Sequence, residues 1–216
     1  MQPTPASLPR LIQAIAAVIQ ENAEAVTALD QAIGDGDHVI NLQRGINALV
    51  LQSAEFDRLD WAAALQKIGM TLMTAVGGAS GSLYGTLFIA MGKAVRQRPF
   101  NLQTFAEVFA QGVEAVKQRG RADLGEKTLL DVLIPVAKTL RQEAAEAAPL
   151  PEVLEKITRA AEAGVESTRD MLAAKGRASF LGERARGHLD PGAKTSQLMI
   201  AAIAQVLAEE PSATPT

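Results

Sequence analysis

Apolar side chains recur every three or four residues along most of this chain, which is the spacing of one face of an α-helix. In the first such run, Leu11, Ile15 and Val18 share a face, and the run continues to an acidic turn. The pattern predicts eight helices: from Ser7 to the acidic turn, from Val39 to about Ser53, from Trp61 to about Ala75, from a glycine-rich turn to about Arg96, from after Asn101 to a polar loop at Arg119, from Thr128 through Leu140, from Val153 to Met171, and from about Ala193 to Ala208.

No stretch alternates apolar and polar residues as a half-buried strand does, so we predict an all-α fold of eight antiparallel helices, an up-and-down barrel or bundle. Asp60 is expected to cap the third helix, and Thr128 with Asp131 forms a candidate capping box for the sixth. Pro135 is expected to bend the sixth helix or to move its start later. Residues 1–6 and 209–216 are expected to be mobile tails.

Four of the connections between the predicted helices are unusual. The loops after the first, third, fifth and seventh helices are polar and contain glycine, whereas the other connections are plainer. Alternate connections of an up-and-down bundle lie at the same end. We therefore expect these four loops to gather on one rim and to form the functional site there.

Composition narrows the classes of protein to consider. The chain has 216 residues, 48% of them hydrophobic, which suits a single domain over residues 1–216 with a core of about 7–208. A formal net charge of −3 gives no electrostatic reason to expect nucleic acid or an anionic membrane as a partner. The absence of cysteine excludes disulfides and thiolate metal sites. With no leader pattern and no membrane-spanning apolar run, we expect a cytoplasmic protein.

The first unusual loop is strongly acidic. Asp30, Asp35 and Asp37 lie close together in the sequence, and Gly34 and Gly36 allow the backbone to fold sharply between them. Like charges held so close repel one another unless a cation lies between them, and carboxylate oxygens favour Mg²⁺ over Zn²⁺. The spacing does not fit an EF-hand. The alternative is a solvated acidic turn between helices.

The second loop, residues 77–81 (GGASG), presents backbone N–H groups and a hydroxyl group at the start of a helix. Oriented amides and the helix dipole favour phosphate oxygens at such a position. The loop is not a Walker A motif, because no Gly-Lys-Ser/Thr ends it. Close helix packing that requires glycine is the alternative explanation.

The fourth loop carries two candidate phosphate ligands, Arg177 and Arg184, which could equally be surface charges. Asp190 has a structural explanation as the N-cap of the last helix, with Pro191 at its first position. His188 is interpreted as a loop residue rather than a metal ligand.

Together the loops resemble those of a known family, the nucleotide-binding L subunits of dihydroxyacetone kinases. The motifs occur in family order over essentially the full chain. The matching segments are residues 33–38 (IGDGDH), 77–86 (GGASGSLYGT), 125–131 (GEKTLLD), 176–184 (GRASFLGER) and 187–193 (GHLDPGA). The chain departs from the usual pattern at Val39, commonly glycine, and at Ser82, commonly proline.

The resemblance implies a nucleotide on one rim of the helical barrel and two Mg²⁺ ions held by Asp30, Asp35 and Asp37. Positions that contact the phosphates are matched by His38, Asn41, Ala79 and Ser80. Positions around the base and sugar, or closing over the nucleotide, are matched by Gly120, Leu129, Arg177 and Asp190. Of these residues, His38 and Arg177 are the expected catalytic ones.

The resemblance also implies that the chain is half of a kinase. A separate K-type subunit holds dihydroxyacetone covalently in this family, and nothing in this chain resembles it. We expect phosphoryl transfer from a Mg-bound adenine nucleotide to dihydroxyacetone or a related ketose on that partner. The nucleotide is either bound ADP recharged by a phosphotransferase-system protein, which a separate L-like chain favours, or exchanging ATP. The alternatives are a non-catalytic nucleotide-sensing module that docks on a regulator and a lipid- or fatty-acid-directed kinase module.

Overall fold

The computed structural model describes residues 4–209, and these residues form helices and connections without any β-strand. The prediction of an all-α fold is confirmed. The α-helices are α1 (Leu8–Glu21), α2 (Ala23–Ile33), α3 (His38–Leu51), α4 (Trp61–Ala75), α5 (Gly78–Ala94), α6 (Leu102–Gly120), α7 (Leu130–Ala145), α8 (Leu150–Ser167) and α9 (Pro191–Ala208). Three 3₁₀ segments accompany them: η1 (Pro5–Ser7), η2 (Ser53–Arg58) and η3 (Arg177–Ala185).

The first predicted helix is in fact two helices, α1 and α2, so residues 4–209 contain nine α-helices rather than eight. The break lies at Asn22, whose backbone has φ −100° and ψ 8°. Its side-chain Nδ2 donates to the Val18 carbonyl at 2.8 Å, and its backbone N–H donates to the same oxygen at 3.1 Å. The Val18 carbonyl therefore accepts from both groups of Asn22, a local side-chain bond that is common where asparagine ends a helix.

The chain ends also differ from the prediction where the structure describes them. Pro5 is buried within η1, so the segment just before α1 packs on the body of the protein. The remainder of the two predicted tails, residues 1–3 and 210–216, lies outside the described residues. At the other boundaries, α8 ends at Ser167 instead of Met171, and α9 begins at Pro191 instead of Ala193.

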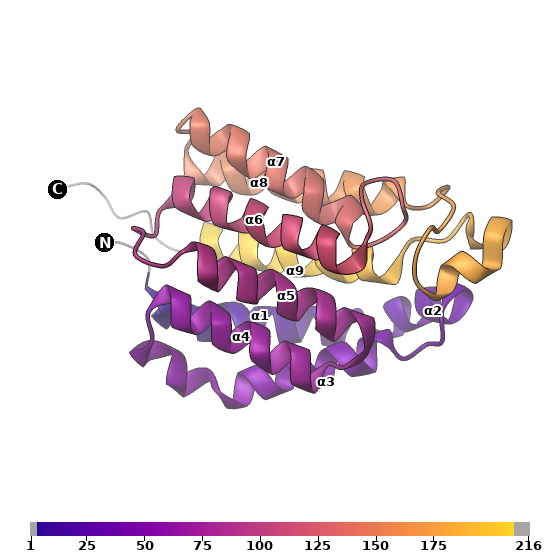
Figure 1. Cartoon of the computed structure of the whole chain (residues 1–216), viewed down its shortest axis with the longest axis horizontal. Coiled ribbons are helices and arrows are strands. Elements are labelled where there is room, and N and C mark those ends of the chain that lie inside the picture. The colour runs from indigo at the N-terminus through magenta and orange to yellow at the C-terminus, as the bar shows by residue number, and fades with distance from the viewer. Residues whose placement is uncertain (1–3, 210–216) are drawn as a thin grey trace.

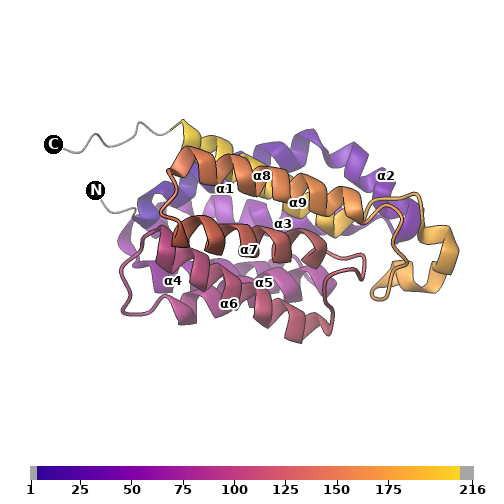
Figure 2. The same ribbon diagram turned by 90° about the horizontal axis from the view of Figure 1, so that it is seen from above.

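Eight helices form a closed ring around one hydrophobic core. Each of α1, α3, α4, α5, α6, α7, α8 and α9 packs against the next, and α9 packs against α1. Figures 1 and 2 show the long helices running side by side along the longest axis of the molecule. The helix α2 contributes less to the ring and extends toward η3, which it contacts. This extension carries the acidic turn to one end of the molecule.

The helix caps follow the sequence signals. The Asp60 carboxylate accepts the Ala63 N–H at 2.7 Å, which confirms Asp60 as the N-cap of α4. Asp131 accepts the Thr128 N–H at 2.7 Å, and the Thr128 hydroxyl oxygen accepts from Leu130 N at 3.1 Å. The predicted capping box is therefore present in part, with the threonine bonded one residue earlier than in the standard motif.

Pro135 lies inside α7 without delaying its start. A proline has no N–H to donate to the carbonyl four residues earlier, which here belongs to Asp131. Gly164 of α8 packs against this same carbonyl: a Cβ placed on Gly164 would lie 2.4 Å from the Asp131 oxygen. The absence of a side chain at Gly164 therefore sets how closely α7 and α8 approach.

Gly164→Ala is expected to destabilise the protein, although alanine is the better helix former, because its methyl group would overlap backbone atoms of α7. We expect the free energy of unfolding to fall by about 1–3 kcal/mol, as for other overpacked positions. Denaturant unfolding measures the change. Ala163→Gly, at the exposed neighbouring position, gives the size of the helix-propensity effect alone. An unchanged or increased stability of Gly164→Ala would contradict the packing described.

Candidate functional site

The four unusual loops meet at one end of the helical ring and enclose a cleft of about 480 Å³. This is the end where η3 and the acidic turn lie, at the right in Figures 1 and 2. Every site residue that the family resemblance implies lines the cleft: Asp30, Asp35, Asp37, His38, Asn41, Ala79, Ser80, Gly120, Leu129, Arg177 and Asp190. The expectation that alternate loops share one rim is therefore met for the residues lining this cleft.

The three aspartates form a compact cluster. One carboxylate oxygen from each of Asp30, Asp35 and Asp37 lies within 4.8 Å of the others, and Asp30 is the buried member. Gly34 is required there, because a Cβ would lie 2.1 Å from Asp30 Oδ1, and Gly36 has φ +78°. An all-carboxylate set of this kind fits a hard divalent cation such as Mg²⁺.

His38 begins α3 and connects three parts of the fold. Its backbone N–H donates to Asp30 Oδ2 at 3.0 Å. Its Nδ1 lies 3.1 Å from the Ser80 hydroxyl of α5, and its Nε2 lies 3.0 Å from the Thr195 hydroxyl of α9. Burial lowers the pKa of His38, against Asp30 and Asp37, which raise it. A neutral imidazole with both nitrogens engaged is suited to holding α3, α5 and α9 in register.

A buried polar network lies behind His38. The Thr195 and Ser196 hydroxyls donate to the Gly192 carbonyl at 3.1 and 2.8 Å, and the Tyr84 hydroxyl lies 2.9 Å from Ser196 Oγ. Burial raises the pKa of Tyr84, so the phenol stays protonated. Sequence reasoning missed Thr195 and Ser196. Two adjacent hydroxyl residues near the start of the last predicted helix were the available signal.

The glycine-rich turn leads directly into α5. Gly77 and Gly78 have φ +73° and +58°, which places both in the region that favours glycine. A Cβ on Gly81 would lie 3.1 Å from the Leu72 carbonyl, so Gly81 serves close packing. The close-packing explanation therefore holds for Gly81, while Gly77 and Gly78 shape the turn that leads into α5. The first turn of α5, with Ala79 and Ser80, faces the cleft.

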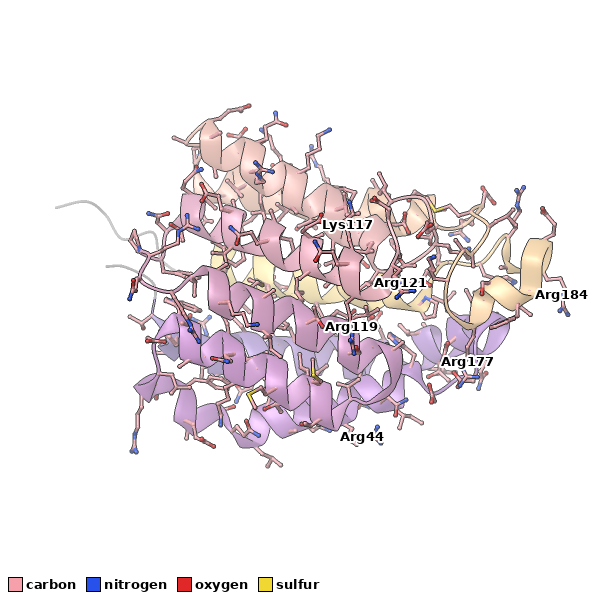
Figure 3. The ribbon with its side chains drawn as sticks, viewed as in Figure 1. Arg44, Lys117, Arg119, Arg121, Arg177 and Arg184 are labelled. Atoms are coloured by element: carbon pink, nitrogen blue, oxygen red, sulfur yellow. The ribbon has the colours of Figure 1, made fainter. Side chains whose placement is uncertain are left out.

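Arg177 and Arg184 lie in different surroundings. Arg177 Nη2 lies 2.7 Å from Asp35 Oδ2, so η3 reaches across to the acidic turn. Arg184 does not line the cleft, and Figure 3 shows it farther out on η3. Of the two arginines, only Arg177 is placed to act at the cleft, and it provides a counter-charge to one member of the aspartate cluster.

Lys127 is a buried residue that sequence reasoning did not single out. Its Nζ donates to the carbonyls of Thr168 and His188 at 2.5 Å each, and to that of Arg169 at 3.3 Å. It therefore ties the end of α8 to the chain that precedes Asp190. His188 supplies only its carbonyl in this arrangement and does not line the cleft, in agreement with its interpretation as a loop residue.

Asp190 combines a capping role with a place in the cleft. Its Oδ2 accepts the Ala193 N–H at 2.7 Å, which confirms it as the N-cap of α9, and its backbone N–H donates to Thr168 Oγ1 at 3.0 Å. Burial raises the pKa of Asp190 to about 7, although the Ala193 N–H and the nearby Lys127 oppose the shift. The carboxyl group therefore titrates well above the range of an exposed aspartate.

Asp190→Asn should gain stability relative to the wild type as the pH rises from about 4 to about 7. The raised pKa means that the folded state holds this proton more tightly than the unfolded chain, so ionisation costs native stability across this window. Asparagine keeps the cap and does not ionise. Because Asp190 borders the cleft, we expect a gain of about 1–2 kcal/mol at pH 8 over pH 5, below the full linkage value.

Denaturant unfolding at both pH values, without nucleotide, measures this gain. Asp60→Asn, at the exposed N-cap of α4, is the matched control and should show no gain of this kind. A stability difference for Asp190→Asn that does not vary with pH would contradict the prediction.

Comparisons with known proteins identify the family of this chain. Residues 32–205 match the DAK2 domain family. The chain is 42% identical over 187 residues to the PEP-dependent dihydroxyacetone kinase 1, ADP-binding subunit DhaL, of Listeria innocua, covering 87% of this chain and 89% of that protein. It is 40% identical over 188 residues to the corresponding ADP-binding subunit DhaL of Escherichia coli K12, covering 87% and 90%.

A solved structure shares the fold. The dihydroxyacetone kinase from C. freundii, crystallised with AMP-PNP and Mg²⁺, superposes with a TM-score of 0.74 at 25% identity, over 95% of this chain and 35% of that enzyme. Within residues 4–209, no helix is both long enough and apolar enough to cross a membrane. The matches confirm the resemblance predicted from the four loops: the chain belongs to the DAK2 domain family, with the ADP-binding L subunits of dihydroxyacetone kinases.

Proposed function

We propose that this chain is the nucleotide-binding subunit of a kinase for dihydroxyacetone or a related ketose. The observation that carries the proposal is the meeting, in one cleft, of the aspartate cluster and the N-terminus of α5. The first arrangement suits a hard divalent cation and the second suits phosphate oxygens. A Mg-bound nucleoside diphosphate or triphosphate combines both ligands. Relatives that are named as kinase subunits support the same assignment.

The charge of the cleft is consistent with this ligand. Asp30, Asp35 and Asp37 would hold two Mg²⁺ ions, whose charge neutralises phosphate oxygens during phosphoryl transfer. Three aspartates, two Mg²⁺ ions and ADP together carry a charge of about −2. Arg177, which already lies against Asp35, would offset part of this remaining charge.

The other residues of the cleft take complementary roles in the proposal. Ala79 and Ser80 offer backbone N–H groups of the first turn of α5 to the phosphates, and Asn41 lines the same cleft. Gly120 and Leu129, on another wall, would border the base and sugar. Because both nitrogens of His38 are engaged by hydroxyl groups, we assign it a positioning role rather than proton transfer.

The proposal requires partner proteins. One partner holds the ketose that accepts the phosphoryl group, and, if ADP stays bound, a second partner supplies the phosphate. The proposal assigns the ketose to a separate K-type subunit that docks over the cleft. Recharging of bound ADP by a phosphotransferase-system protein is favoured by the L. innocua and E. coli relatives, which are named as PEP-dependent and which this chain covers almost fully. The C. freundii enzyme, of which this chain spans about a third, was crystallised with an ATP analogue and represents the exchanging alternative.

Phosphoryl transfer to dihydroxyacetone, assayed with a cognate K-type subunit, tests the proposed function. We expect transfer only when both proteins are present, and the mass of nucleotide released on denaturation to be that of ADP. Nucleotide binding without any transfer would instead favour the sensing module. A protein that releases no nucleotide on denaturation, and that transfers phosphate from added ATP, would favour the kinase that exchanges ATP.

Asp35→Asn is expected to weaken Mg·ADP binding while leaving the helical fold intact, because it removes one anionic ligand without changing the size of the side chain. At limiting Mg²⁺ we expect at least about a tenfold loss of affinity, equivalent to about 1.4 kcal/mol. Calorimetric titration measures it, and Asp57→Asn, in the exposed part of η2, is the control.

In the wild type, Mg²⁺ and ADP together should raise the melting temperature by more than the sum of their separate effects, since each ligand completes the site of the other. Additive shifts would contradict a shared site for the two ligands. An unchanged Mg·ADP affinity of Asp35→Asn would exclude Asp35 as a ligand.

A further inference from the structure

Arg44 of α3 lies outside the cleft but bonds to Asn41, which lines it, and to the two residues directly before Gly77, which also lines it. Its Nε donates to the Ala75 carbonyl at 2.6 Å, and its Nη2 donates to the Val76 carbonyl at 2.8 Å. The same Nη2 donates to Asn41 Oδ1 at 2.7 Å. The side chain is exposed to solvent, at the lower edge of the molecule in Figure 3. One guanidinium group thus links the end of α4 to α3 and bonds to Asn41, the residue of α3 that lines the cleft.

The contact with Asn41 fixes which way its amide group faces. A guanidinium group carries only hydrogen-bond donors, so the Asn41 atom that it contacts must be the oxygen. The amide nitrogen, with two donor hydrogens, is therefore the atom left for a ligand in the cleft that Asn41 lines. If the amide were to rotate, a carbonyl oxygen would replace these donors, and an oxygen facing a phosphate is repulsive.

The contacts with Ala75 and Val76 act on the phosphate-facing loop itself. These two carbonyls end α4, directly before Gly77 and Gly78 turn the chain into α5. Carbonyls at a helix C-terminus lack partners within the helix, and a cationic side chain can satisfy them. The buried Val76 side chain also occupies the space above Gly45, where a Cβ would lie 2.1 Å from Val76 Cγ2. The turn is therefore held against α3 by packing on one side and by Arg44 on the other.

We propose that Arg44 is a positioning residue for the nucleotide phosphates, which acts by orienting the Asn41 amide and by fixing the α4–α5 turn. This inference rests on the proposed function, because it takes the ligand of the cleft to be a Mg-bound nucleotide. Three hydrogen bonds in divergent directions require the planar fork of arginine. A lysine ammonium at the same position keeps the charge but cannot reproduce the fork.

Binding of Mg·ADP and of adenosine to the purified protein tests the proposal, with adenosine followed by NMR titration. Arg44→Gln and Arg44→Lys should each lose about tenfold or more in affinity for Mg·ADP and less than about twofold for adenosine. Arg159→Gln, which removes an exposed arginine from α8, is the control for the change of charge and should alter neither. A general loosening of the cleft would instead weaken both ligands equally and would overturn the proposal.

A double-mutant cycle between Arg44→Gln and Asn41→Ala gives the second readout. If Arg44 acts in part through Asn41, the double variant should lose less Mg·ADP affinity than the sum of the two single losses. Additive losses, or an unchanged affinity of Arg44→Gln, would overturn the inference while leaving the proposed function intact. A wild-type protein that does not bind Mg·ADP would overturn both.

Discussion

The mutual repulsion of three aspartate carboxylates is the constraint that the rest of the site must satisfy. Asp30 is buried at the end of α2, where the His38 N–H and the space left by Gly34 accommodate its oxygens. Asp35 is balanced by Arg177, which comes from the distant η3 segment. The cluster therefore depends on contacts between parts of the chain that are far apart in sequence. Closing the helical ring is what brings these parts together.

The arrangement of the site could be predicted because it follows from local signals. The apolar periodicity places the helices, and the alternation of polar and plain connections places four loops on one rim. The N-caps Asp60 and Asp190 each accept a hydrogen bond from the backbone N–H three residues later. Such caps depend only on neighbouring residues, so they were predictable for the same reason. The break at Asn22 was missed because the apolar pattern continues through it, and a side-chain bond to a carbonyl one turn earlier leaves no trace in that pattern.

The interactions that hold the site were harder to predict, because they depend on tertiary distances. Lys127 resembles a surface lysine in sequence, yet its ammonium group is buried among three carbonyls from the segment between α8 and α9. The family resemblance predicts that His38 contacts the phosphates, but only the structure shows that its imidazole bonds to hydroxyl groups of α5 and α9. A sequence pattern identifies the residue types near a site, but it does not show which atoms are already engaged.

The ion pair between Arg177 and Asp35 has a consequence for how the cleft exchanges its contents. The same carboxylate faces an internal cation and is a proposed ligand of an external one, so the two compete for it. Any partner that draws the guanidinium group toward itself raises the affinity of the carboxylate for the external cation. By thermodynamic linkage, the bound cation raises the affinity of the protein for that partner by the same factor. The protein thus carries its own counter-ion, and an arriving surface with acidic groups would act on metal retention without touching the metal.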